Sequence, residues 1–224
     1  MPLTHSEENY LKAIWKLVGH SHDQVTTNAI AALVHTKAAS VTDMIKKLSE
    51  KKLVRYTPYQ GVALTNTGRR VAAQVVRKHR LWEAFLVQHL GFRWDEVHEV
   101  AEQLEHIRSE KLTEQLDRFL GYPKSDPHGD PIPDREGRIH GAGHLPLADF
   151  GKKAIVIVTG VSDHSSSFLR YLDHNRIRLG DTIGIKSLNS YDHSMFVSVS
   201  KRKAIYISQQ VAKNILVRKL RNGK

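Results

Sequence analysis

The chain has 224 residues, 40% of them apolar and 25% charged, which is the composition of an ordinary soluble protein and leaves room for one large domain or two to three small ones. It contains no cysteine, so disulfides, thiolate metal ligands and cysteine nucleophiles are excluded as well. No apolar run approaches the roughly 18 residues that span a bilayer, and the first residues do not resemble a signal peptide. We therefore expect a cytoplasmic protein without a membrane partner.

The formal net charge of +11 is unevenly distributed along the chain. Residues 1–80 carry a net charge of +8, residues 81–140 carry −6, and residues 141–224 carry +9. A basic segment beside a carboxylate-rich one indicates that one part of the chain binds phosphate and that the other binds a cation.

Three short helices are predicted in the first fifty residues. The capping-box pair Thr4 and Glu7 precedes apolar residues at helical spacing, which predicts a first helix over residues 6–18. A second helix opens near Thr27, and a third follows a short break. Two short helices joined by a tight turn are typical of helix-turn-helix DNA-binding proteins. The second of them begins with small or polar side chains and carries lysines further along, as a recognition helix does.

Residues 53–68 alternate apolar and polar side chains around Tyr59, Gln60 and Gly61, which predicts a β-hairpin. A recognition helix followed at once by a hairpin is a winged helix. A generic helical bundle is the alternative for the three helices alone. The hairpin with Arg55 and the basic charge favour double-stranded DNA as a partner, because phosphate neutralisation supplies most of the non-specific affinity.

Two further helices, predicted over residues 67–89 and 94–109, carry an unusual set of imidazoles and carboxylates. Side chains four positions apart lie on one helix face, so each of these two helices presents a pair of potential metal ligands on one side. The six residues are His79, Glu83, His98, Glu102, Glu105 and His106. Nitrogen and oxygen ligands without sulfur suit Mn²⁺, Fe²⁺ or Co²⁺, and Zn²⁺ would also bind. The competing interpretation is a solvated polar face.

The rest of the chain predicts a self-association surface, a linker and a small β domain. The predicted long helix and its end carry more apolar residues than one buried helix face needs. This excess favours a homodimer and comprises Trp82, Phe85, Leu86 and Leu90. Residues 122–146 are too rich in proline and glycine for regular structure and are expected to be a linker. Beyond them, β-rich runs over residues 152–161, 181–188, 194–200 and 203–208 and a brief helix over 168–175 predict a small β-barrel.

The order of winged helix, HRLWEAFL, VHEVAEQLEH, DPHGDPIP and a β-rich tail resembles the metal-dependent repressors typified by the diphtheria toxin repressor, the iron-dependent regulators and the manganese transport regulators. The resemblance implies a mainly α protein with a small β domain. It divides the chain into a winged helix-turn-helix DNA-binding domain (1–72), a helical dimerisation and metal-binding domain (73–140), a linker (141–150) and an SH3-like barrel (151–224).

The resemblance also implies roles for individual residues. His79, Glu83 and His98 match the first metal site of that family. Glu102, Glu105, His106 and, from the first helix, Asn9 match the second. His164 matches an auxiliary ligand from the barrel. The DNA-contacting positions are Lys37, Ala39, Ser40, Thr42, Asp43 and Lys47.

The function implied is repression of metal-uptake genes by a dimer that binds operator DNA when metal is plentiful. Glu102 stands where iron-type members have cysteine, so the likeness favours Mn²⁺ over Fe²⁺, although Asn9 departs from both patterns and Lys12 stands where some manganese regulators have a ligating glutamate.

A zincin protease does not fit, because the segment from His98 ends in Glu102 where that motif needs a second histidine. We expect that the protein is not an enzyme and binds no organic substrate. A metallohydrolase and a winged-helix sensor of an organic ligand remain the alternatives.

Overall fold

The computed structural model describes the chain except for residues 1–2, 20–23, 58–59, 141–142, 201–203 and 221–224. Contacts divide it into two compact units, each described here by itself. The amino-terminal unit comprises Met1–Trp82, Ala101–Tyr122 and Ile132–His140. The carboxy-terminal unit comprises Glu83–Val100, Pro123–Pro131 and Gly141–Lys224. The domain boundaries at residues 72 and 140 stay predictions.

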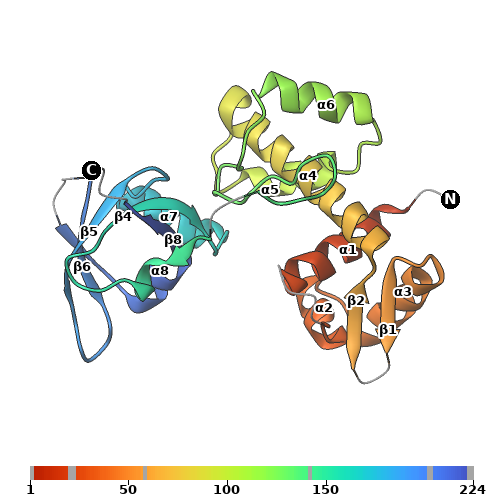
Figure 1. Cartoon of the computed structure of the whole chain (residues 1–224), viewed down its shortest axis with the longest axis horizontal. Helices are drawn as coiled ribbons and strands as arrows, with labels where there is room; N and C mark the ends of the chain where they lie inside the picture. Colours follow the sequence, from red (N-terminus) through yellow and green to blue (C-terminus); the bar gives the residue numbers. More distant parts are fainter. Residues whose placement is uncertain (1–2, 20–23, 58–59, 141–142, 201–203, 221–224) are drawn as a thin grey trace. The chain divides into compact units, whose positions relative to one another are not determined.

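Three helices open the amino-terminal unit: α1 (His5–Val18), α2 (Thr27–Leu33) and α3 (Ala38–Glu50) (Figure 1). The predicted capping box is confirmed, since Thr4 accepts from the Glu7 N–H and donates its own N–H to the Glu7 carboxylate. Each helix buries one apolar face, and burial of a side chain such as Leu11 or Ile45 contributes about 1.5–3 kcal/mol.

The predicted hairpin follows α3 as two antiparallel strands, β1 (Val54–Thr57) and β2 (Gly61–Leu64). Tyr59, expected in its turn, lies outside the described residues. Val62 also exchanges backbone hydrogen bonds with Val25, which ties the hairpin to the segment before α2. Helices α1, α2 and α3 and the hairpin share one apolar core, so the winged helix is confirmed.

Helix α4 (Asn66–Leu90) matches its prediction, whereas α5 (Val97–Leu104) is shorter than the predicted 94–109. The predicted helix ends early because Ser109 is the N-cap of the next helix. Its hydroxyl accepts from the Leu112 N–H and caps α6 (Glu110–Phe119). Glu105 and His106 therefore occupy the turn after α5 rather than its interior. Among the described residues, no helix is long and apolar enough to cross a membrane.

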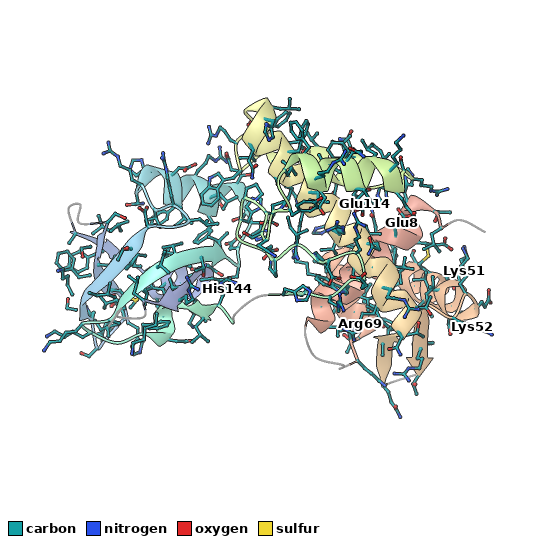
Figure 2. The ribbon with its side chains drawn as sticks, turned by 45° about the horizontal axis from the view of Figure 1, so that its top comes forward. Glu8, Lys51, Lys52, Arg69, Glu114 and His144 are labelled. Carbon is teal, nitrogen blue, oxygen red and sulfur yellow. The ribbon has the colours of Figure 1, made fainter. Side chains whose placement is uncertain are left out.

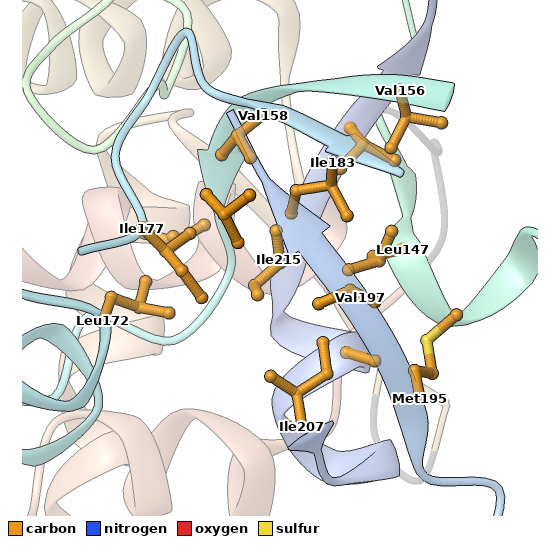
Figure 3. Packing of buried hydrophobic residues seen from close by; sticks show 14 of the residues in the cluster. Leu147, Val156, Val158, Leu172, Ile177, Ile183, Met195, Val197, Ile207 and Ile215 are labelled. Carbon is orange, nitrogen blue, oxygen red and sulfur yellow. The ribbon is translucent and has the colours of Figure 1, made fainter. Parts of the chain in front are cut away.

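The carboxy-terminal unit is built on a six-stranded antiparallel sheet of order β3-β8-β4-β5-β6-β7. Its strands are β3 (Leu145–Pro146), β4 (Ile155–Val161), β5 (Thr182–Leu188), β6 (Met195–Val199), β7 (Ala204–Ile207) and β8 (Ile215–Lys219). The 3-10 turn η1 (Leu147–Asp149) and helices α7 (Ser166–His174) and α8 (Gln209–Asn214) complete it. Figure 3 shows the core that alternate strand residues form between these elements.

The segment expected to be a linker is irregular but not a passive spacer. No helix occurs in its described residues, as predicted, yet Asp126, His128 and Ile132 are buried. The sheet also begins inside it, because Leu145 pairs with Val217.

Candidate metal centre

Predicted ligands from two parts of the amino-terminal unit lie together. Helix α4 supplies His79, and the end of α5 with its following turn supplies Glu102, Glu105 and His106. Asn9 lies on α1 next to Glu8, which contacts His106, and three residues before Lys12, which contacts Glu102 and Glu105. The Glu105 side chain is fully buried at 0% exposure, while that of Glu102 is 46% exposed.

Glu105 is the centre of this group. Its Oε2 lies 2.6 Å from His79 Nδ1, and its Oε1 lies 3.8 Å from His106 Nε2. Lys12 Nζ is 2.8 Å from the same carboxylate and 3.2 Å from Glu102 Oε1. Burial alone would raise the pKa of the Glu105 carboxyl, but the His79 hydrogen bond and the Lys12 charge outweigh it and hold that pKa below its ordinary value.

His106 is oriented from its other side. Its Nδ1 lies 2.5 Å from Oε2 of Glu8, a buried residue of α1 labelled in Figure 2, and its ring stacks on His5 with centroids 4.3 Å apart. A carboxylate that holds one ring nitrogen fixes the tautomer and leaves the other nitrogen available for a metal. Sequence reasoning missed Glu8.

Replacing Glu8 with glutamine should therefore weaken metal binding without removing a ligand. Loss of such a supporting partner typically lowers metal affinity about 10–100-fold. Titration calorimetry with Mn²⁺ measures the change. Glu7→Gln is the matched control, because Glu7 pairs with Lys51 at 2.6 Å instead. Equal affinity in the Glu8 variant and the control would show that Glu8 does not position His106.

A second group forms in the carboxy-terminal unit, and part of it was not predicted. Glu83, Asp126 and His128 are all buried, and one ligand atom from each lies within 4.8 Å of the others. His98 joins them, with Nδ1 at 3.2 Å from Glu83 Oε1. His164, the predicted auxiliary residue, stacks on His128 with ring centroids 4.6 Å apart.

The turn that holds Asp126 and His128 is fastened to the sheet. The Asp126 carboxylate accepts the N–H groups of His128 and Asp130, and the His128 carbonyl accepts the Val161 N–H at 2.9 Å. Gly129 has φ +90°, and a Cβ there would lie 2.2 Å from the Thr159 carbonyl oxygen. Only glycine fits this approach, so the backbone fixes His128 against β4.

Carboxylates keep His128 charged in this group. Burial alone would lower its pKa, but the Glu83 carboxylate 3.8 Å from Nδ1, with the charge of Asp126, raises that pKa to about 9. The two carboxylates therefore favour positive charge at this position, and a metal ion bound by His128 would replace the ring proton.

Both groups fit a divalent ion of intermediate hardness. Two buried polar atoms, Asn9 Oδ1 on α1 and His128 Nδ1 in the second group, form no hydrogen bond with any described residue. Such atoms cost about 1–3 kcal/mol and call for a partner such as an ion. The donor atoms are imidazole nitrogens and carboxylate or amide oxygens, which suit Mn²⁺ and Fe²⁺. His79 lies one helical turn before Glu83 on α4, and its Nδ1 faces Glu105.

The predicted DNA-contacting residues line the outer face of α3 and its start. Val41, Ile45 and Leu48 face the core of the unit. Lys37, Ala39, Ser40, Asp43 and Lys47 are exposed, and Thr42 is half-buried, with its hydroxyl donating to the Ala38 carbonyl. Small side chains near the amino end and a lysine further along suit entry into a major groove.

Three family profiles match successive parts of the chain. Residues 2–62 match "Iron dependent repressor, N-terminal DNA binding domain", residues 65–134 match "Iron dependent repressor, metal binding and dimerisation domain", and residues 145–219 match "FeoA domain".

Individual relatives agree with these profiles. An uncharacterized HTH-type transcriptional regulator of Methanocaldococcus jannaschii is 34% identical over 118 residues, 53% of this chain and 94% of that protein. The iron-dependent repressor IdeR of Mycobacterium tuberculosis is 33% identical over 148 residues, 66% of this chain and 63% of that protein. A solved manganese-dependent transcriptional repressor in complex with manganese superposes with a TM-score of 0.87 at 35% identity, covering 96% of this chain and 100% of that one.

Proposed function

This chain belongs to the iron-dependent repressor family of metal-dependent, DNA-binding transcriptional repressors, and from that premise we propose that Mn²⁺ is its activating ion, with Fe²⁺ as the second candidate. The carboxylate at position 102, in place of a thiolate, supports this choice because harder oxygen ligands suit manganese. The similarity to a solved manganese-dependent repressor also supports it.

The amino-terminal group of Asn9, Glu102, Glu105 and His106 is the proposed activating site, with His79 beside it. The observation that carries this proposal is the buried Glu105, which is reached by side chains from α1 and α4. Its oxygens and those of Asn9 and Glu102 would hold the ion with the His106 imidazole. The ion supplies positive charge that lets these carboxylates approach one another.

The second proposed site is the carboxy-terminal group of Glu83, His98, Asp126 and His128. His164, stacked on His128, supports that site as a neighbour or a further ligand. Each chain would thus bind two ions.

DNA binding follows from α1 being shared between the proposed activating site and the winged helix. Because α1 packs its apolar face against α2, α3 and the hairpin, a ligand that fixes α1 also fixes the orientation of α3. A ligand shifts such an equilibrium only by its differential affinity for two states, and coupling of about 1–3 kcal/mol corresponds to roughly 5–150-fold tighter DNA binding. The protein would act in the cytoplasm as a homodimer on two half-sites, without catalysis and without an organic substrate.

The test of this function is operator binding titrated with Mn²⁺, Fe²⁺ and Zn²⁺ side by side. A duplex selected by the Mn²⁺-loaded protein from a random-sequence pool serves as the operator. We expect micromolar Mn²⁺ to lower the dissociation constant for that duplex roughly 5–150-fold. An equal dissociation constant with each metal and with chelator would refute metal control.

A further inference from the structure

Lys12 occupies a position between two carboxylates of the proposed activating site. Its ammonium nitrogen is 3.2 Å from Glu102 Oε1 and 2.8 Å from a Glu105 oxygen. The Lys12 side chain is 18% exposed, and that of Glu105 is fully buried. Lys12 lies on α1 three residues after Asn9, so the two side chains share one side of that helix.

This contact compensates a costly charge. A buried carboxylate is strongly unfavourable without a cation or a set of hydrogen bonds, and Lys12 supplies both to Glu105. The same ammonium also neutralises Glu102, which would otherwise repel Glu105 one turn away. Lys12 therefore does electrostatically what a metal ion would do in the same place.

The ammonium and a divalent ion compete for the same oxygens. An ion bound by Glu102 and Glu105 would lie within a few ångström of Lys12 Nζ, where like charges repel. The lysine stem is flexible and the side chain is 18% exposed, so the ammonium has a route to water.

Building on the proposed function, we infer that metal enters the activating site by exchange for the ammonium of Lys12, which makes Lys12 an internal competitor that raises the metal concentration needed for activation. The free energy of metal binding is reduced by that of breaking two ion pairs. Lys12 thus tunes the sensing threshold without being a ligand.

The experiment compares Mn²⁺ affinity in wild type, Lys12→Met and Lys16→Met by titration calorimetry. All three carry His128→Gln, the reference being otherwise wild type, so that the activating site is measured alone. Lys16 is exposed on the same helix one turn later, which makes it a matched loss of charge. We expect Lys12→Met to bind Mn²⁺ about tenfold tighter, equivalent to about 1.4 kcal/mol, and Lys16→Met to stay within about twofold of wild type.

Thermal unfolding supplies an independent readout. Without metal, Lys12→Met should melt at a lower temperature than Lys16→Met, and saturating Mn²⁺ should raise its melting temperature by more. Lys12→Gln, which keeps a hydrogen-bond donor but not the charge, carries the same expectations if the methionine variant does not fold.

The outcomes separate two failures. If Mn²⁺ binds wild type and Lys16→Met but binds both Lys12 variants equally or more weakly, the exchange is refuted while the proposed function stands. If wild type and Lys16→Met bind no Mn²⁺, the proposed activating site itself is refuted, and the inference falls with it.

Discussion

Glu105→Gln should abolish the metal dependence of DNA binding. The variant keeps the shape of the buried side chain but removes the charge that meets His79 and Lys12. An amide oxygen binds a divalent ion more weakly than a carboxylate does, so the ion loses its central ligand. The dissociation constant for the selected duplex should be equal with Mn²⁺ and with chelator, a loss of the roughly 5–150-fold stimulation expected for the unaltered chain.

The control is Glu99→Gln, which removes an exposed carboxylate from the same helix. It should retain full stimulation by Mn²⁺. Circular dichroism melts of both variants establish that they are folded. Full stimulation in folded Glu105→Gln would remove this residue from the activating site.

His128→Gln should halve the number of ions bound per chain, from two to one. The imidazole is 1% exposed and its backbone is hydrogen-bonded to β4, so the substitution removes a buried nitrogen ligand from the group. Equilibrium dialysis with Mn²⁺ counts the ions directly. Asp126→Asn should weaken the same ion, because it removes one of the two carboxylates that face His128.

The exposed His174 at the end of α7 is the matched histidine in the same unit. His174→Gln should keep two ions. A folded His128→Gln that still binds two ions would show that the carboxy-terminal group of Glu83, His98, Asp126 and His128 is not a site.

Periodicity was enough to predict most of the helical architecture. The apolar spacing in α1 and α4 and the Thr4 capping signal are local features, and the structure keeps all of them. The end of α5 was wrong, because the Ser109 cap belongs to the following helix and competes with continued helical spacing. Strands β3 and β8 were missed, since each gains its hydrogen bonds only from tertiary pairing.

The candidate sites were predictable only where the ligands lie on helices. His79 with Glu83, and His98 with Glu102, stand out at four-residue spacing in the sequence. Asp126 and His128 do not, because proline and glycine indicate irregular backbone but say nothing of burial. The two aspartates and the histidine around Gly129 were the available signal. The burial of His128 depends on a hydrogen bond from Val161, more than thirty residues away.

Reciprocal linkage provides the most direct measurement of metal-controlled DNA binding. If Mn²⁺ tightens DNA binding by a given factor, DNA must tighten Mn²⁺ binding by the same factor. Mn²⁺ affinity is therefore measured for the protein alone and for the protein saturated with the selected duplex. We predict an increase of roughly 5–150-fold on DNA, equal to the change in duplex affinity with Mn²⁺. Identical Mn²⁺ affinity with and without DNA would contradict the proposed coupling.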